Sequence, residues 1–286
     1  MHFQWFPGHM TKAIRAMKED IRLIDLIIEL ADARIPVSSR NPEIDSLAQG
    51  KTRILLLNKR DMADDTATKE WVKHFENEGI YALAINARKK NELHAVTNLI
   101  DKACREKRER DLKRGIKNRP VRAMIVGIPN VGKSTFINSY VGRASTKTGN
   151  RPGVTKGKQW IRMNGGKNGS SVELLDTPGI LWPKFEDQTV GLHLAWIGSI
   201  RDERIVSTDL ALDLIEYLQD EHPSVISGHY GFEPEGDSVH ILEQLAGARG
   251  CIAKGGELDY DKAAFFLLDD FRNARLGTIT IEKSDR

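Results

Sequence analysis

Residues 127–134 read Gly-Ile-Pro-Asn-Val-Gly-Lys-Ser, which matches the phosphate-binding pattern G-x-x-x-x-G-K-[ST]. The β-rich run VRAMIV (121–126) precedes this stretch, and TFINSYVG, which can form a helix, follows it. In such a strand–loop–helix unit the glycines let backbone N–H groups turn toward phosphate oxygens, and the helix N-terminus favours negative charge. We expect Lys133 to bridge the β- and γ-phosphates of a nucleotide and Ser134 to ligate Mg²⁺. The residues of this loop expected to contact the nucleotide are Asn130, Val131, Gly132, Lys133, Ser134 and Thr135.

The motif Asn58-Lys-Arg-Asp61 predicts which base is bound. It follows the apolar run RILLL (53–57), so it should lie at the carboxyl end of a buried strand, where α/β sheets bind their ligands. A carboxylate at Asp61 can accept hydrogen bonds from N1–H and N2–H₂ of guanine, and adenine offers no such pair. Asn58 would tie this loop to the phosphate loop, and the Lys59 stem would cover the face of the base. The two motifs together predict GTP and GDP as ligands and disfavour a P-loop kinase or ATPase.

A third motif, Asp176-Thr-Pro-Gly179, follows the predicted strand SVELL and has the position of a nucleotide sensor. Asp176 can hold Mg²⁺ through water, and the N–H of Gly179 can meet the γ-phosphate. The stretch RPGVT (151–155) lies between this motif and the phosphate loop, which places Thr155 to close over Mg²⁺.

A second guanine loop is expected directly after the predicted strand YALAI. Its residues are Asn86-Ala-Arg88, and the N–H of Ala87 would donate to guanine O6. Many GTPases carry Ser or Thr where Asn86 stands. The tripeptide therefore indicates a guanine loop only because it directly follows a predicted strand.

The order of these motifs along the chain defines the fold class. In ordinary small GTPases the phosphate loop comes first, whereas here both base loops precede it. Predicted strands alternate with helices in most places, which is typical of an α/β sheet, and NGGKNGS between the last two strands predicts a hairpin. We therefore predict one six-stranded P-loop GTPase domain in circularly permuted order, followed by a small, mainly helical C-terminal domain. The predicted strands are 26–31, 53–57, 80–85, 121–126, 158–163 and 171–175, and the helices about 44–49, 66–78, 91–112 and 134–141.

The domain boundaries follow from the same pattern. Residues 1–183 form the predicted GTPase domain, with an N-terminal tail over 1–10 and a basic arm over 101–122. Residues 184–286 form the helical domain, in which three stretches begin near Ser, Thr or Asp and carry apolar residues at helical spacing. These stretches are STDLALDLIEYLQ, DSVHILEQLAGARG and DYDKAAFFLLDDFRNARLG.

The chain resembles the circularly permuted GTPases and, within them, the ribosome biogenesis GTPase A family of bacteria. Besides the three nucleotide motifs, the resemblance rests on WFPGHM (5–10), DARIP (32–36), DTPGILWPKF (176–185) and the C-terminal pattern GARG…AAFFLLDDFRNARLGTITIE. The resemblance implies GTP hydrolysis coupled to late maturation of the large ribosomal subunit. It also implies that the helical domain touches ribosomal RNA.

The position after Gly179 indicates how hydrolysis is expected to work. Ras-type enzymes place a water-orienting Gln there, but this chain has Ile180, so we expect slow intrinsic hydrolysis that needs help from elsewhere. The resemblance points to His9, which either acts chemically or positions the N-terminus; His193 is a weaker candidate and more typical of a structural helix residue. The expected catalytic set is His9, Lys133, Thr155 and Gly179.

The phosphate loop resembles those of potassium-activated GTPases, in which Asn at the position of Asn130 ligates a monovalent cation. A K⁺ ion there would supply the charge that an arginine finger brings in other GTPases. We therefore expect Mg²⁺ as cofactor and K⁺ as activator.

Charge is unevenly distributed along the chain. Residues 184–286 carry a net −10, whereas residues 101–122 hold ten basic and four acidic side chains. This excess in the basic arm predicts contact with RNA phosphates. The expected RNA contacts are Lys113, Arg114 and Lys117 in the arm, and Arg272 and Arg275, with Arg249 and Lys254, in the helical domain. Because that domain is acidic, contact with a ribosomal protein is equally compatible with its sequence.

Composition excludes several classes of protein. The chain has 286 residues with only two cysteines, so a disulfide framework is excluded and a reducing cytoplasm is expected. It has no apolar run near the ~20 residues of a membrane helix. We expect GTP or GDP and the large ribosomal subunit with its rRNA as partners, and no membrane or DNA. The main alternative is a guanine-nucleotide-dependent ribosome- or RNA-binding module whose own turnover is incidental; a GTPase of tRNA modification is less favoured.

Overall fold

The computed structural model describes residues 8–116, 119–142, 159–163, 171–182, 187–200 and 206–284. Contacts within the chain divide it into two compact units. The sheet unit comprises the chain up to Asp187 together with the residues from Thr280 onward, and the helical unit comprises Gln188–Ile279.

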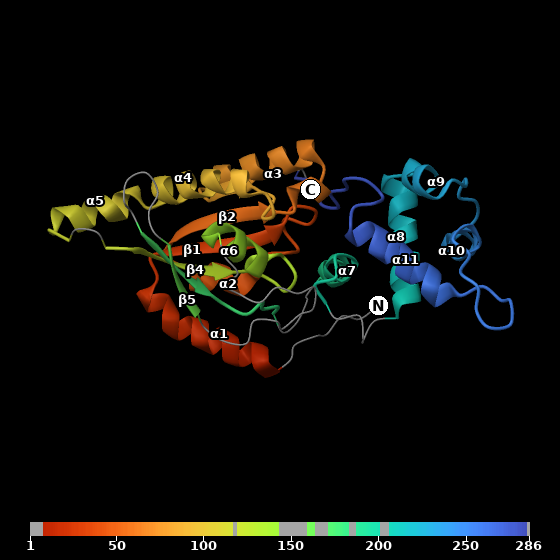
Figure 1. Ribbon diagram of the computed structural model, residues 1–286, viewed down its shortest axis with the longest axis horizontal. Coiled ribbons are helices and arrows are strands. Elements are labelled where there is room, and N and C mark those ends of the chain that lie inside the picture. Colours follow the sequence, from red (N-terminus) through yellow and green to blue (C-terminus); the bar gives the residue numbers. More distant parts are fainter. Residues whose placement is uncertain are drawn as a thin grey trace. The chain divides into compact units, whose positions relative to one another are not determined.

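The sheet unit is built on six strands in the order β3-β2-β1-β4-β6-β5. Figure 1 labels β1, β2, β4 and β5 of this sheet. All neighbours pair in parallel except β5 and β6, which are antiparallel. The parallel strands are apolar runs because helices cover both faces of such a sheet. The predicted fold class is confirmed. The strands are β1 (Leu26–Asp32), β2 (Thr52–Asn58), β3 (Tyr81–Ala84), β4 (Val121–Val126), β5 (Gln159–Met163) and β6 (Val172–Asp176).

The helices of the sheet unit begin and end close to the predicted positions, with two differences. The predicted helix over 91–112 is interrupted at Cys104, and the helix that follows the predicted N-terminal tail already begins at Gly8. The turn of the predicted hairpin, residues 164–170, lies outside the described residues. The helices are α1 (Gly8–Asp20), α2 (Pro42–Leu47), α3 (Asp65–Asn77), α4 (Leu93–Ala103), α5 (Arg105–Lys113) and α6 (Lys133–Val141), and 3₁₀ turns span Ile21–Leu23, Arg60–Met62 and Lys90–Glu92.

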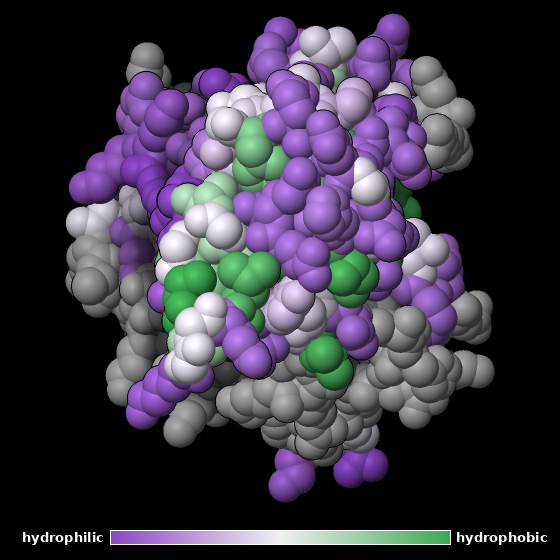
Figure 2. Space-filling model, turned by 90° about the vertical axis from the view of Figure 1, so that its right-hand side faces the viewer, coloured by the Kyte–Doolittle hydropathy of each residue, from purple (hydrophilic) through white to green (hydrophobic). Residues whose placement is uncertain are grey.

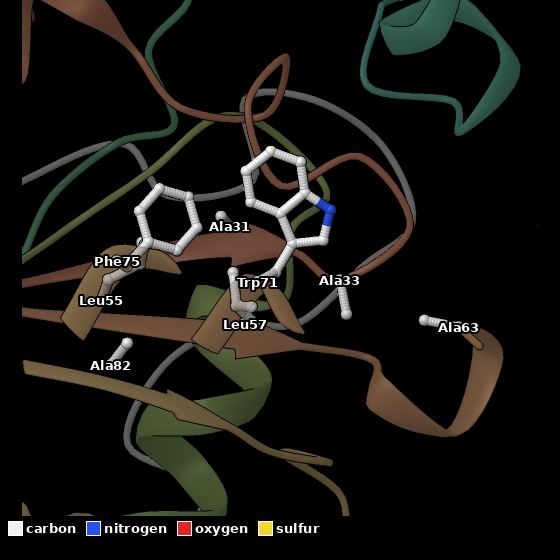
Figure 3. Close-up of a cluster of buried hydrophobic side chains, with 8 residues drawn as sticks. All are labelled: Ala31, Ala33, Leu55, Leu57, Ala63, Trp71, Phe75 and Ala82. Atoms are coloured by element: carbon white, nitrogen blue, oxygen red, sulfur yellow. The ribbon is translucent and has the colours of Figure 1, made fainter. Parts of the chain in front are cut away.

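Helix α3 shows why these elements pack as they do. Asp64 caps its N-terminus by accepting the N–H of Ala67 at 2.7 Å. Trp71 and Phe75, four residues apart and therefore on one face, are both buried in a cluster that includes Leu55 of β2 (Figure 3). This packing sets β2, and with it the loop after Asn58, against a rigid helix.

The last residues of the chain belong to the sheet unit, although the sequence assigned all of 184–286 to the helical domain. The Oγ1 of Thr280 accepts the N–H of Asp64 at 3.0 Å, and the carbonyl of Glu282 accepts Trp71 Nε1–H at 2.9 Å. These contacts join positions more than 200 residues apart, which sequence pattern does not reveal.

In the part of the helical unit that the structure describes there are five helices, of which α8, α10 and α11 pack against one another. Asp237 and Asp259 cap α10 and α11 through backbone N–H groups, and Leu210, Leu214 and Leu218 fill the core from α8. The surface shown in Figure 2 is mainly hydrophilic with small hydrophobic areas. The apolar residues at helical spacing in α8, α10 and α11 are largely buried and form the unit's own core. The helices are α7 (Gln188–Trp196), α8 (Ser207–Glu221), α9 (Ser224–Tyr230), α10 (Ser238–Ala248) and α11 (Tyr260–Arg272).

Candidate nucleotide-binding site

The phosphate loop runs from the end of β4 to the first turn of α6, as its motif predicts. Gly127 has a φ of 149°, and a Cβ there would lie 2.5 Å from the carbonyl oxygen of Leu30. Gly132 has a φ of 98°, and a Cβ there would collide with the side chain of Asn58. Both positions require glycine because the loop turns tightly and approaches β1 and β2 closely. The loop is therefore shaped by its neighbours as well as by its own sequence.

Lys133 lies buried at the start of α6. Its Nζ donates to the carbonyl oxygens of Gly127 at 2.9 Å and Ile128 at 2.7 Å. Burial lowers the pKa of the Lys133 ammonium, and the carboxylate of Asp176 opposes this shift. The ammonium thus sits inside the loop, bound to oxygens that phosphate oxygens can replace.

Asp176 ends β6 beside this lysine and is also buried. Burial raises its pKa, while Lys133 and a backbone hydrogen bond from Thr177 act against the rise. Its Oδ1 is buried and has no hydrogen-bond partner among the residues that the structure describes. A buried carboxylate oxygen of this kind requires a partner, and Mg²⁺ or one of its waters could supply one. These residues, with Ser134 in the adjacent turn, therefore fit Mg²⁺.

The stretch after Asp176 packs directly on the phosphate loop. A Cβ on Gly179 would lie 2.8 Å from the Cα of Pro129, so only glycine fits this contact. The N–H of Ile180 donates to the carbonyl of Gly127 at 3.3 Å, and the Ile180 side chain is only 3% exposed. The residue at the position where Ras-type enzymes carry Gln is therefore turned into the core.

Asn41 makes a contact with the stretch after Gly179 that the sequence did not reveal. Its side chain is buried, caps α2 by accepting the N–H of Glu43 at 3.0 Å, and donates through Nδ2 to the carbonyl of Ile180 at 3.2 Å. The N-terminus of α2 is in this way attached to the stretch that follows Gly179. The only local signal was an Asn-Pro pair typical of a helix start.

Asn58 joins the phosphate loop to the second predicted guanine loop. Its Nδ2 donates to the carbonyl of Val131 at 2.7 Å, and its Oδ1 accepts the N–H of Ala87 at 3.0 Å. The first bond is the tie between the two loops that the motif predicts. The second differs from expectation, because the Ala87 N–H was assigned to guanine O6. Asn86 supports the same loop by accepting the N–H of Arg88 at 2.9 Å.

Lys59 and Asp61 occupy the loop after β2. Lys59 has a φ of 60°, and its Nζ lies 2.8 Å from Oδ2 of Asp32 at the end of β1. Asp61 lies in the 3₁₀ turn and is exposed, so its carboxylate is accessible to a ligand. The carboxylate predicted to read the base thus follows a lysine whose side chain is held by the neighbouring strand.

Asp32 is the centre of a buried ionic cluster. Both its oxygens accept hydrogen bonds from the Arg34 guanidinium at 2.9 Å. Burial alone would raise the pKa of Asp32, but the charges of Arg34 and Lys59 outweigh burial and hold it well below its usual range. Burial likewise lowers the pKa of Lys59, against the attraction of Asp32. Asp32 and Arg34 are the first and third residues of DARIP, and nothing in that local sequence indicated their ion pair.

Several predicted residues lie elsewhere or outside the described chain. Thr155 and Lys117 are outside it, and of His9 the structure describes only its backbone in α1. His193 lies in α7 and stacks on the ring of Trp196, with centroids 5.7 Å apart, which agrees with a structural residue of the helical unit.

The predicted RNA-contact arginines of the helical unit are held by protein groups. Arg272 donates to the carbonyls of Ala195 at 2.9 Å and Trp196 at 3.1 Å, so its guanidinium caps the end of α7. Arg275 pairs with Asp269 and Asp270. In the basic arm, Lys113 and Arg114 are exposed at the end of α5 and form no ion pair within the described chain.

The residues that the structure describes contain no group of three or more His, Cys, Asp and Glu residues suited to a metal ion. None of their helices is long and apolar enough to cross a membrane.

Comparison with known proteins identifies the family. Residues 122–230 match the family described as 50S ribosome-binding GTPase. The chain is 44% identical over 287 residues to ribosome biogenesis GTPase A of Bacillus pumilus, with 100% of both chains covered. It is 46% identical over 285 residues to the protein of that name from Priestia megaterium, covering 99% of this chain and 97% of the relative. This chain belongs to the ribosome biogenesis GTPase A family.

A solved structure supports the same assignment. The crystal structure of GNP-bound YlqF from T. maritima matches with a TM-score of 0.68 and 28% identity, covering 95% of this chain and 98% of that one. The chain is therefore a GTPase, which hydrolyses GTP to GDP and phosphate, with its motifs in permuted order and a role in ribosome biogenesis. The resemblance inferred from the motifs is confirmed.

Proposed function

We propose that this GTPase is a nucleotide-dependent switch in late assembly of the large ribosomal subunit and that the ribosomal particle stimulates its hydrolysis. The burial of Ile180 carries this proposal. A side chain turned into the core cannot orient the attacking water, so the chain needs a further group to complete hydrolysis. The family description, a 50S ribosome-binding GTPase, supports the large subunit as the source of stimulation.

The nucleotide contacts follow from the loops that meet at the carboxyl edge of the sheet. Asp61 binds the guanine edge, Lys59 covers the base, and Asn58 with Asn86 and Ala87 shapes the base loops. Backbone groups of Asn130, Val131, Gly132 and Thr135 surround the phosphates, while Lys133 leaves the carbonyls of its own loop for the β- and γ-phosphates. The N–H of Gly179 meets the γ-phosphate.

Mg²⁺ is proposed to be held by Ser134 and, through water, by Asp176, whose partnerless Oδ1 supports this assignment. Thr155 is proposed as the group that closes over the ion. When bound, Mg²⁺ neutralises charge on the phosphate oxygens.

Asn130 is proposed to ligate K⁺. It has a φ of 59° within the phosphate loop, a conformation that Asn tolerates better than most residues. Equal hydrolysis rates in KCl and NaCl would contradict this assignment.

Stimulation is proposed to act through His9, and RNA contact through the end of the basic arm. Lys113 and Arg114 are the best supported, because both are exposed and free of ion pairs in the described chain. Lys117 lies in the same arm. Arg275 and Arg272 contribute less, since protein groups already bind them.

The testing experiment measures GTP hydrolysis in KCl with and without purified large ribosomal subunits. We expect stimulation of at least about tenfold, equivalent to about 1.4 kcal/mol of barrier. His9→Ala should lose most of the stimulation and keep the basal rate. No stimulation by mature or immature large subunits would overturn the proposal. Single-turnover measurements on the particle separate a switch from a binding module with incidental turnover, because only the switch releases the particle at the rate of hydrolysis.

A further inference from the structure

The C-terminal tail of the chain, defined here as Thr280–Ser284, makes specific contacts beside the nucleotide site. The chain leaves the sheet unit after Asp187 and re-enters it at Thr280. The N–H of Ile281 then donates to the carbonyl of Arg34 at 2.8 Å. The carboxylate of Glu282 accepts the N–H of Val37 at 2.6 Å and that of Ser38 at 3.0 Å. One carboxylate thus binds two successive backbone N–H groups, an arrangement in which the charge strengthens both bonds.

The tail binds a short stretch that touches both ends of the nucleotide site. This stretch, called here the bridge segment, is Asp32–Asn41. At its first residue, Asp32 holds Nζ of Lys59 in the guanine loop. At its last residue, Asn41 holds the carbonyl of Ile180, next to the predicted γ-phosphate contact. Glu282 binds the middle of the segment, between these two points.

Hydrogen bonds within the bridge segment connect its residues to one another. A displacement at its middle therefore affects its ends. The N–H of Asp32 donates to Oγ of Ser39 at 2.9 Å, and Ser39 Oγ donates to the carbonyl of Ile35 at 2.6 Å. Arg34 and Ser39 are both buried. Because well-packed buried groups move together rather than one at a time, the segment behaves as one small rigid element.

We propose that Glu282 is a positioning residue for the nucleotide site, acting through the bridge segment on the guanine loop and on the stretch after Gly179. The inference rests on the proposed assignment of those two loops to guanine and the γ-phosphate. In this proposal the C-terminal tail, which follows the helical unit in sequence, supports the GTPase site through the bridge segment. Events that pull the tail from the segment weaken nucleotide binding without touching a nucleotide contact.

The experiment compares Glu282→Ala, Glu282→Gln and, as matched control, Ser284→Ala in the full chain. Ser284 lies in the same tail, and within the described chain its hydroxyl donates to an exposed carboxylate of Glu70 at 3.4 Å. Dissociation of fluorescent mant-GDP is followed by stopped flow, and the unfolding temperature of each variant is recorded. Loss of a charged acceptor for two N–H groups should speed dissociation about tenfold in Glu282→Ala. Glu282→Gln, which keeps one acceptor oxygen, should be intermediate, and Ser284→Ala should match the wild type.

A double-mutant cycle with Asn41→Ala separates positioning from general destabilisation. If Glu282 acts through the bridge segment, Glu282→Ala and Asn41→Ala loosen the same element, and their combined effect on dissociation is smaller than the product of the single effects. Ser284→Ala with Asn41→Ala should be multiplicative.

The outcomes distinguish this inference from the proposed function. A wild-type chain that fails to bind mant-GDP overturns the assignment of the nucleotide site. A wild-type chain that binds, with a folded Glu282→Ala variant within twofold of it, overturns the positioning role. The positioning role is also overturned if the effects of Glu282→Ala and Asn41→Ala on the dissociation rate multiply. In that case Glu282 only stabilises the fold.

Discussion

At the guanine end of the site, the buried carboxylate of Asp32 is fully paired with Arg34 and Lys59, whereas at the phosphate end the buried carboxylate of Asp176 keeps one oxygen without a partner in the described chain. Lys133 at the phosphate end is bound to carbonyls of its own loop. In the described chain, the carboxylate at the proposed guanine end is therefore satisfied by protein groups, while the one at the proposed phosphate end keeps an oxygen for which a metal ion is the proposed partner. Under this proposed assignment we expect affinity for the base to be preorganised and sensing of the phosphates to depend on an exchange of hydrogen-bond partners.

The largest expected effect comes from removing the ammonium at the phosphate end. Lys133→Met should weaken GTP binding by about 100-fold, because a charge-assisted contact to two phosphates is lost. Thermal stability should be unchanged or slightly higher, since Met of similar length replaces a buried charge. Calorimetric titration with a GTP analogue measures the affinity. Lys69→Met, on the exposed face of α3, is the control. A loss of affinity below threefold for Lys133→Met would show that phosphates do not replace the loop carbonyls as partners of Lys133.

An intermediate effect is expected at Ile180. Ile180→Gln restores the residue type of Ras-type enzymes, yet the side chain would remain in the core, because Asn41 holds the carbonyl of residue 180 in place. Burying the amide should destabilise the fold by about 2 kcal/mol and leave intrinsic hydrolysis no faster. Urea unfolding and phosphate release measure the two quantities. Faster hydrolysis in this variant would mean that the stretch turns outward when GTP binds, and the burial argument would then be wrong.

The smallest effect is a change in pH dependence at the guanine end. The pKa of Asp32 lies below its ordinary value of 3.8, so its ion pairs contribute stability that is fully present above about pH 4. This contribution is lost as the pH falls through the folded pKa. Asp32→Asn should therefore be less stable than the wild type at pH 7, and the difference should shrink below pH 4. Unfolding midpoints in urea across this range check the sign. Asp65→Asn is the control, because the ion pair of Asp65 with Lys69 is exposed and should give only a small difference of the same sign. A stability difference between Asp32→Asn and the wild type that does not change with pH would show that the charge of Asp32 does not contribute, and that the variant is destabilised by altered packing.

Much of the fold was predictable because its signals are local. The strands before residues 58, 86, 127 and 176 are apolar runs that end in turn residues, and all four turns lie at the carboxyl edge of the sheet. The break at Cys104 was not predictable, since basic helix formers continue on both sides of it. Nor was the partner of the Ala87 N–H, because Asn58 and a guanine base offer the same acceptor chemistry.

By itself, the sequence determined the nucleotide motifs, their permuted order and the family, because phosphate and guanine recognition depend on residue types at fixed short spacings. Only the tertiary structure decided which groups support those motifs. The contacts of Asp32 with Lys59, Asn41 with Ile180 and Glu282 with Val37 join residues 27, 139 and 245 positions apart. No local pattern encodes such pairs, since they exist only after the sheet has brought its strand ends together and the chain has returned from the helical unit.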